Sequence, residues 1–381
     1  MYSLDNYGTM ISDRVRLDAH AEALRRVVTP STVVVDIGAG TGIMSLLACK
    51  FGARRVYAVE PSPAVQLLVE AARDNGYADR IVVLQRRSNE VTLPERADVI
   101  VSDLRGVLPP FQTHFADVVD ARERLLANGG RLVPATDTIW IAPVSAQDAF
   151  EERRRPWQDR DGLVLHSALR VLDSSPFKHR ARPEDLLGPA ARWADIDYQR
   201  MTSFGLRGAG SCNVARAATA HGLLAWFDTV LVEGVEYSNA PGPVEGIYGQ
   251  FLFPWPEPVT MQEGDSVAFE VRADPICGDV LWTWTSEIRR GRGPDAGNVR
   301  FRQSTFNSWL APPDSLRKRA GSFAATLSPA GVRSLQVLEG IRAGKTIGEI
   351  AAHLLDTHPG RFPSIDDAHG FVAELIERFC V

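Results

Sequence analysis

The segment VVVDIGAGTG, residues 33–42, constrains the fold of this chain more than any other stretch of its sequence. Its β-branched residues favour a strand, and its glycines at positions 38, 40 and 42 permit a tight turn and a close approach to a ligand. The next run, GIMSLLACKFGA at residues 42–53, has the composition of a helix. A strand, a glycine turn and a helix in this order predict a cofactor site at the end of a buried strand.

The alternation of strand and helix continues to about residue 143. Apolar runs that are typical of strands lie at 55–60, 80–85, 97–104 and 131–143, and helical stretches lie at 62–76 and 115–128. Continuous apolar strands indicate a parallel sheet that is covered on both faces. We therefore expect an α/β fold, with a doubly wound Rossmann-like domain over residues 1–143.

The sequence changes character after residue 144. Residues 150–200 are rich in Arg, Pro and Asp and resemble an exposed helical excursion, whereas strands dominate from 214 to 288. Short strands separated by Pro and Gly favour a β-barrel or sandwich, which we place at residues 144–305. Beyond residue 322 the pattern is helical again and predicts a third, small domain over 322–381.

Composition excludes several classes of partner. The net charge of −5 attracts neither nucleic acid nor an acidic membrane, and no stretch approaches the roughly 20 apolar residues that span a bilayer. The N-terminus lacks a basic segment followed by an apolar run, so we expect no secretion signal. The four cysteines have no Cys or His neighbours at metal spacing; they are Cys49, Cys212, Cys277 and Cys380. Reduced thiols, a cytoplasmic location and no metal are the expectations.

The ligand of the glycine turn can be a dinucleotide or S-adenosyl-L-methionine, since the glycine spacing fits both. Asp36 precedes the first glycine, and GAGTG lacks the GxGxxG spacing that is typical of pyrophosphate binding. Glu60 ends the next strand about 20 residues beyond the turn, where a carboxylate can accept both ribose hydroxyls. These details favour S-adenosyl-L-methionine, and the alternative is a plain turn beside a solvent-exposed Glu60.

Longer motifs make the comparison specific. VVVDIGAGTGIMS (33–45), VYAVEPS (56–62) and RRSNEVTLPERADVIVSDLRG (86–106) resemble the cofactor and active-site segments of the protein arginine methyltransferase family. YGTMISDRVRLDAH (7–20) resembles the helix that closes over the cofactor, and YSNAPGPVEGIYGQ (237–250) resembles a barrel segment. SSPFKHRARPEDLLGPAARWADID (174–197) is similar to the family's dimerisation arm. The resemblance covers about residues 2–290 and implies a head-to-tail homodimer through an arm at about 165–200.

The resemblance also implies roles for individual residues. Arg16 corresponds to the arginine that pairs with the cofactor's carboxylate, and its alternative is an exposed helix arginine. Met10 corresponds to a residue near the sulfonium, with core filling as the alternative. The full expected cofactor set is Met10, Arg16, Asp36, Gly38, Gly40, Gly42, Glu60, Pro61, Ser88 and Asn89. Substrate contacts are expected from Tyr7 and Tyr248.

The chain departs from the family at the residues that bind arginine. The family uses two glutamates to clamp the guanidinium, and their positions hold Asp103 and Gln112 here. The family's barrel Thr-His-Trp motif is replaced by Gly246, Ile247 and Tyr248. A buried cation loses charge-assisted bonds worth about 1.5–3 kcal/mol each when one carboxylate is missing. This loss favours a neutral or anionic acceptor, with Asp103 or His114 as base or orienting group beside Gln112.

The last segment has no counterpart in that family. LEGI and KTIGEIAAHL, followed by a final amphipathic helix, resemble the PqqD-like winged-helix domains that bind leader peptides of ribosomally made natural products. Such domains capture the leader on a β-edge, for which residues 321–328 (GSFAATLS) are the candidate. A helical cap on the methyltransferase or its dimer mate, and a DNA-binding winged helix, are the alternatives.

These observations lead to a main functional hypothesis and three alternatives. The main one is methylation, on O or N, of a ribosomally made peptide whose leader binds the C-terminal domain. The alternatives are methylation of a small-molecule natural product, arginine methylation by an altered active-site loop, and a non-catalytic scaffold that binds the cofactor. Retention of Asp36, Glu60 and Arg16 argues against the scaffold, because a scaffold has no need of them.

Overall fold

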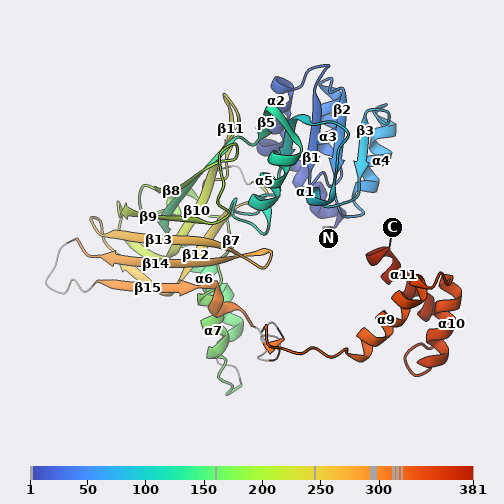
Figure 1. Ribbon diagram of the computed structural model, residues 1–381. Coiled ribbons are helices and arrows are strands. Elements are labelled where there is room, and N and C mark those ends of the chain that lie inside the picture. The colour runs from blue at the N-terminus through green and yellow to red at the C-terminus, as the bar shows by residue number, and fades with distance from the viewer. Residues whose placement is uncertain are drawn as a thin grey trace. The chain divides into compact units, whose positions relative to one another are not determined.

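The computed structural model describes residues 3–158, 161–243, 246–291, 298–310, 314, 317–318 and 321–380. The chain divides into two compact units, Met1–Trp309 and Leu310–Val381. The first unit contains a parallel sheet followed by two antiparallel sheets, and the second is helical (Figure 1).

The parallel sheet carries the glycine turn. Its strands are β1 (Val33–Ile37), β2 (Arg55–Val59), β3 (Ile81–Leu84), β4 (Ala97–Ser102) and β5 (Leu126–Val133), in the order β3-β2-β1-β4-β5. All four strand pairs are parallel. Its helices are α1 (Leu4–Ser12), α2 (Arg14–Val27), α3 (Ile43–Lys50), α4 (Val65–Asp74) and α5 (His114–Arg124), with a 3-10 turn at Ser88–Glu90. The predicted doubly wound Rossmann-like domain is confirmed, because strand order reverses between β1 and β4.

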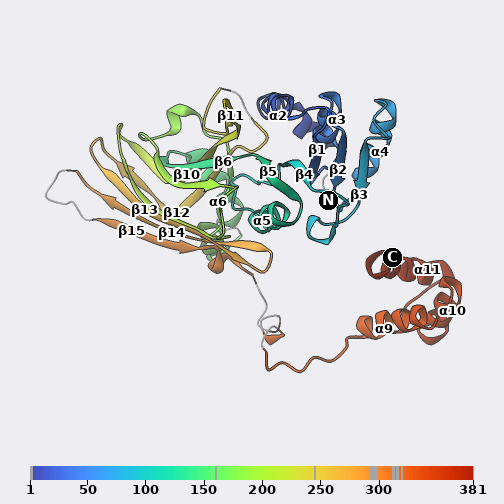
Figure 2. The ribbon, with the colours of Figure 1, turned by 45° about the horizontal axis from the view of Figure 1, so that its top comes forward.

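The apolar run at residues 131–143 was expected as one strand and is two. β5 ends at Val133, and β6 (Thr136–Val144) begins the next sheet after Pro134 and Ala135. Proline has no backbone N–H to donate to a ladder, so it interrupts the run between two sheets. Figure 2 shows β5 and β6 in succession at this junction.

The antiparallel part consists of two sheets. One has the order β7-β12-β10-β6-β8 with β11 paired to β10, and the other has the order β15-β14-β13-β9. The strands are β7 (Phe177–His179), β8 (Ala191–Asp197), β9 (Leu206–Asn213), β10 (Ala218–Val232), β11 (Val235–Ser238), β12 (Gln250–Met261), β13 (Ser266–Ile276), β14 (Asp279–Arg289) and β15 (Val299–Ser304). Trp255, Trp284 and Phe253 are fully buried in this part. The expected β-barrel is thus a barrel-like pair of sheets, with no ladder joining the two among the described strands.

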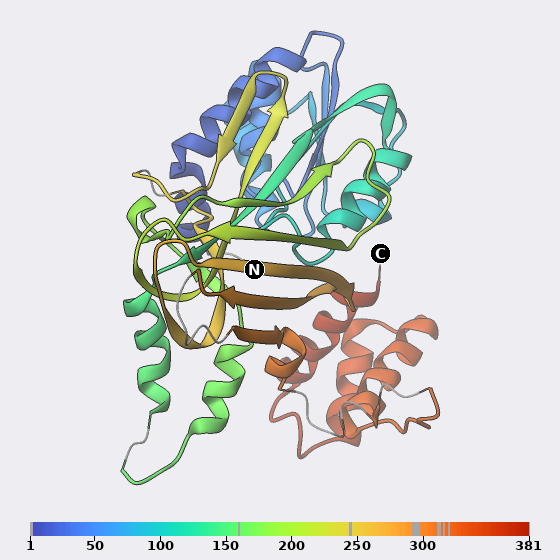
Figure 3. The ribbon, with the colours of Figure 1, turned by 90° about the vertical axis from the view of Figure 1, so that its left-hand side faces the viewer.

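A helical hairpin projects from the antiparallel sheets. It consists of α6 (Gln147–Arg154), a 3-10 turn (Arg155–Trp157) and α7 (His166–Asp173), the green helices in Figure 3. Of these two helices, only α7 lies within the range of about 165–200 that was expected for the dimerisation arm, and the arm itself stays a prediction. The later part of that range contains two short strands, β7 and β8, and a 3-10 turn at Pro183–Asp185.

The second unit contains three helices. They are α9 (Pro329–Arg342), α10 (Ile347–Thr357) and α11 (Ile365–Phe379), which share a small core around Val337, Leu354 and Val372. Ser328 caps α9, and Thr346 forms a capping box with Glu349 at the start of α10. The edge strand expected at 321–328 was wrong: those residues are exposed and non-helical, and none of residues 321–380 forms a strand that could pair with them. The PqqD-like winged helix is not confirmed.

Two features are absent from the part of the chain that the structure describes. No helix there has the length and apolar character that crossing a bilayer requires. The same residues contain no group of three His, Cys, Asp or Glu side chains arranged to hold a metal ion.

Candidate active site

The glycine turn after β1 is packed closely from three directions. Gly38, Gly40 and Gly42 have positive φ angles of 75°, 54° and 88°, which only glycine adopts without strain. A Cβ atom on Gly38 would lie 2.3 Å from Leu104, and one on Gly40 would lie 2.9 Å from the Tyr7 ring. A Cβ on Gly42 would lie 2.2 Å from Leu68 of α4. The first two glycines therefore bring backbone to the cavity, whereas Gly42 serves the packing of α3 on α4.

A cavity of about 820 Å³ opens at this turn. Its lining contains the predicted site residues Tyr7, Met10, Arg16, Asp36, Gly38, Gly40, Glu60, Pro61, Asp103, Gln112, His114 and Tyr248. Gly42, Ser88 and Asn89 are absent from the lining, and the last two lie in the 3-10 turn Ser88–Glu90. One cavity thus joins the expected cofactor residues to the expected acceptor residues.

The two acidic residues beside the turn are held by short contacts. Glu60 accepts hydrogen bonds from the backbone N–H of Gly40 at 3.0 Å and of Ser62 at 2.8 Å. Asp36 is buried and accepts from the Ser45 hydroxyl at 2.6 Å. Burial raises the pKa of Asp36 to about 6. Glu60 is therefore fixed at the end of β2, where a carboxylate can meet a ribose.

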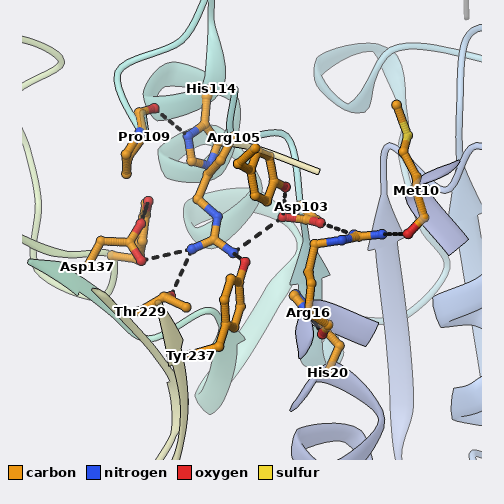
Figure 4. A network of polar contacts seen from close by, with 12 residues as sticks. Met10, Arg16, His20, Asp103, Arg105, Pro109, His114, Asp137, Thr229 and Tyr237 are labelled. Atoms are coloured by element: carbon orange, nitrogen blue, oxygen red, sulfur yellow. Dashed lines mark hydrogen bonds and ion pairs between the residues drawn. The ribbon is translucent and has the colours of Figure 1, made fainter. Parts of the chain in front are cut away.

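Arg16 and Asp103, which both line the cavity, form a largely buried ion pair (Figure 4). Arg16 lies in the first turn of α2, and its Nη2 also donates to the Met10 carbonyl at 2.6 Å. Asp103 lies directly after β4, at the carboxyl edge of the parallel sheet. The guanidinium that was expected to take the cofactor's carboxylate therefore contacts the loop carboxylate in this structure.

Both carboxylate oxygens of Asp103 accept hydrogen bonds. Oδ1 accepts from the Tyr248 hydroxyl at 2.6 Å and from Arg105 Nη2 at 3.3 Å, while Oδ2 accepts from Arg16. Burial alone would raise the pKa of Asp103, but the charges of Arg16, His20 and Arg105 outweigh it and hold that pKa well below its usual range. A carboxylate so strongly held is a weak base, so this geometry suits an orienting role better than proton removal.

Arg105 is the main site residue that the sequence analysis missed. Its side chain is fully buried and donates to Asp137 Oδ1 at 2.8 Å, Thr229 Oγ1 at 2.8 Å and the Tyr237 hydroxyl at 2.5 Å. These three acceptors form one row across β6, β10 and β11, because Asp137 pairs with Thr229 and Thr229 with Tyr237. Arg105, which lines the cavity, is thus anchored on the antiparallel sheet, and Figure 4 shows these contacts.

The remaining predicted residues differ in their settings. His114 is buried, its Nδ1 contacts the Pro109 carbonyl at 2.9 Å, and burial lowers its pKa to about 4. Because a carbonyl only accepts, Nδ1 carries the proton, and His114 Nε2 is left without a hydrogen-bond partner among the described residues. Gln112 is exposed and adopts a positive φ of 47°. The role of His114 as a base and that of Gln112 as the neutral partner of Asp103 stay predictions.

The segment Gly246–Tyr248 is tied to both sides of the site. Ile247 N–H donates to Asp13 Oδ2 at 2.8 Å, and Lys178 of β7 donates to the Ile247 carbonyl. Asp13 and Lys178 were not singled out from the sequence, since each reads as an ordinary surface charge there. Residues 244 and 245, which precede this segment, lie outside the described residues.

Comparison with known proteins shows the family. Residues 20–129 match the family described as ribosomal protein L11 methyltransferase (PrmA), and residues 135–279 match the arginine methyltransferase oligomerization subdomain. Protein arginine N-methyltransferase PRMT10 of Oryza sativa subsp. japonica is 30% identical over 297 residues, which cover 68% of this chain and 77% of that protein. The chain belongs to the protein arginine N-methyltransferase family. The expected enzyme class, an S-adenosyl-L-methionine-dependent methyltransferase, is confirmed at the level of this family.

Other members of the protein arginine N-methyltransferase family match less of their own length. Protein arginine N-methyltransferase 2 of Mus musculus is 30% identical over 289 residues, covering 69% of this chain and 64% of that protein. The chain spans about half of the probable protein arginine N-methyltransferase 6 of Arabidopsis thaliana, with 30% identity over 231 residues and 52% coverage of that relative.

Solved structures of the family share this fold. The Trypanosoma brucei PRMT1 enzyme-prozyme heterotetrameric complex with AdoHcy has a TM-score of 0.71 at 20% identity, covering 78% of this chain and 97% of that one. Arabidopsis thaliana protein arginine methyltransferase 10 has a TM-score of 0.70 at 20% identity, covering 80% and 98%. At this identity the likeness establishes the fold alone.

Proposed function

We propose that this chain is an S-adenosyl-L-methionine-dependent methyltransferase that modifies a protein or peptide side chain, with arginine nitrogen as its acceptor. The observation that carries the proposal is one cavity lined by Glu60 and Arg16 on the cofactor side and Asp103 on the acceptor side. The names of the relatives, all protein arginine N-methyltransferases, support arginine.

The residues present fit the cofactor. Glu60 presents a fixed carboxylate for the ribose hydroxyls, and Arg16 presents a planar guanidinium suited to a carboxylate. When bound, the cofactor supplies a methyl group on a positively charged sulfur. The work of the protein is then to place the acceptor in line with that methyl group, for which orientation contributes most. Asp103, ionised and held by Tyr248, is the group that would orient the acceptor.

A second candidate acceptor is an uncharged group, such as a hydroxyl, an amide or an imidazole. It is favoured by two observations: Gln112 is neutral, and Asp103 already faces the guanidinium groups of Arg16 and Arg105. A cationic acceptor would add a third guanidinium around one carboxylate, in a place where burial makes unpaired charge costly. An uncharged acceptor avoids that cost.

The methylation of a ribosomally made peptide natural product is not supported by these comparisons. The matched family regions end at residue 279, and the described residues of the unit Leu310–Val381 contain no strand of the kind by which a leader was expected to bind. The role of this unit stays open to experiment. A homodimer through the helical hairpin and a cytoplasmic location are part of the proposal, supported by the oligomerization subdomain match for the former.

The proposal is tested with labelled S-adenosyl-L-methionine and a set of peptides that differ only at one central residue, Arg, citrulline, Gln, Ser or His. Label on the arginine peptide, lost in a Glu60→Ala variant, supports the proposal. Label confined to an uncharged residue establishes the second candidate. Label only on small molecules would point to a small-molecule substrate, and tight cofactor binding without any transfer would favour a scaffold.

A further inference from the structure

Arg105 is held so firmly that it cannot leave the active site when ligands bind. Its Nη1 contacts Asp137 and Thr229, its Nη2 contacts Tyr237, and the guanidinium carbon lies 5.0 Å from the centre of the Phe227 ring. The side chain has no exposed surface. A charged group with this many fixed partners is a permanent part of the cavity wall.

Asp103 meets Arg105 through one oxygen only. Oδ1 is shared by Arg105 Nη2 at 3.3 Å and the Tyr248 hydroxyl at 2.6 Å. Oδ2 contacts Arg16, the residue that fits the cofactor's carboxylate. The two oxygens therefore differ in their partners. Oδ1 accepts from two protein donors, Arg105 and Tyr248, whereas Oδ2 would lose its partner if a ligand carboxylate bound Arg16.

From this asymmetry, and resting on the proposed function, we infer that Arg105 is a positioning residue that limits Asp103 to a single oxygen facing the acceptor. A guanidinium binds a carboxylate best through two parallel N–H···O bonds, and this site offers one. Gln112 cannot supply the missing charge, because its side chain is neutral. Asp103 therefore holds the acceptor by one charge-assisted bond. With one bond instead of two, the site has little preference for a guanidinium over an uncharged group of the same shape.

The test compares methylguanidinium with N-methylurea, its uncharged isostere, on protein saturated with S-adenosylhomocysteine. The affinity ratio of the two probes is measured by NMR titration in the wild type and in Arg105→Gln combined with Asp137→Asn. The double substitution avoids leaving the Asp137 carboxylate buried without its cation. Without Arg105, Oδ1 keeps only its hydrogen bond from Tyr248 among these two donors, so a second N–H of the acceptor can reach it. The ratio should then rise in favour of methylguanidinium about tenfold, as expected for one added charge-assisted bond.

Two further variants separate positioning from structural support. Tyr248→Phe removes the other donor on Oδ1, at 2.6 Å, and should shift the ratio in the same direction. Thr229→Val removes an anchor of Nη1 while Nη2 keeps its contact with Asp103, so it should lower thermal stability and leave the ratio unchanged. An unchanged ratio in both the double variant and Tyr248→Phe, or no binding of either probe to any variant, overturns the inference. Because no methyl transfer is measured, failure of the proposed function would show separately.

Discussion

The carboxylate of Asp13 joins the start of α2 to the segment that carries Tyr248. Oδ1 accepts from the backbone N–H of Arg16 at 3.2 Å, and Oδ2 accepts from the backbone N–H of Ile247 at 2.8 Å. Arg16 and Tyr248 in turn contact the two oxygens of Asp103. The Asp13 side chain, which does not itself contact Asp103, thus helps to position both residues that do, Arg16 and Tyr248.

Asp13→Ala should weaken binding of S-adenosylhomocysteine and lower stability. Loss of a helix N-cap costs about 1 kcal/mol, and the Ile247 N–H loses its acceptor as well. Calorimetric titration and thermal unfolding measure the two effects. Asp18→Ala, an exposed change on the same helix, is the matched control and should alter neither. Equal cofactor affinity in Asp13→Ala and the control would contradict the assigned role.

Asp103→Asn should reduce methyl transfer by about 10- to 100-fold, the loss expected from one charge-assisted bond to the acceptor. S-adenosylhomocysteine should bind at least as well as to the wild type, because Arg16 no longer has a competing carboxylate. Weaker cofactor binding would instead place Asp103 among the cofactor contacts.

Asp103 also gives the chain a defined response to acid. Its folded pKa lies below the ordinary 3.8, so its stabilising effect is complete above that value and disappears as the pH falls toward the lower folded value. The stability difference between wild type and Asp103→Asn should therefore be largest near neutral pH and shrink in acid. Thermal unfolding measured from neutral pH downward checks this, with the exposed Asp74→Asn as a control.

Asp36 should behave in the opposite way. Burial raises its pKa from 3.8 to about 6, so the folded chain binds a proton more tightly than the unfolded chain between these values. Stability contributed by the protonated form is lost as the pH rises through about 6. Asp36→Asn keeps an oxygen for the Ser45 hydroxyl and removes the titration. Its melting temperature relative to the wild type should be higher at pH 8 than at pH 4; a constant difference would show that Asp36 does not titrate in this range.

Gly42 and Gly52 provide a matched pair for the glycine turn. Both have positive φ angles, 88° and 102°, but a Cβ meets Leu68 at 2.2 Å only at Gly42 and nothing within 4 Å at Gly52. Gly42→Ala should therefore destabilise the chain by about 1–3 kcal/mol more than Gly52→Ala, from overpacking. Denaturant unfolding measures both. Leu68→Ala should recover part of the loss in Gly42→Ala, and the absence of any recovery would rule out the clash as its cause.

The tip of the helical hairpin offers a test of dimerisation. Leu163 and Val164 are 63% and 68% exposed there, which is unusual for neighbouring apolar residues of a monomer. Leu163→Glu with Val164→Glu should shift the molecular mass measured by light scattering toward the monomer. Leu67→Glu, at an exposed position on α4, is the control. Deleting 170–200 would be a poor test, because β7 and β8 belong to the sheet.

Local patterns predicted the parallel sheet and its cofactor end well. The run from Val33 to Gly42 specifies a strand and a turn through β-branched residues and glycines, and neither depends on distant contacts. Caps such as Thr346 with Glu349 are equally local. The spacing from the glycine turn also placed Glu60 at the cofactor, whereas Arg16 and Asp103 were expected in the site from the resemblance to the protein arginine methyltransferase family.

Features that depend on distant residues were not predictable. Arg105 looks like a surface arginine until Asp137, Thr229 and Tyr237 line up across three strands to receive it. The run at 131–143 was expected as one strand, and which sheet each half joins depends on partners elsewhere in the chain. The edge strand at 321–328 failed for a related reason, since a strand needs a neighbour that the described part of the tail does not provide.

The short connection between Val133 and Thr136 restricts how this chain can vary in length. Only Pro134 and Ala135 separate the two strands, and Asp137 is the second residue of β6. Successive side chains of a strand point to opposite faces, so one inserted or deleted residue that shifted β6 by one position would turn Asp137 away from Arg105. Insertions in related chains should therefore be rare between β5 and β6.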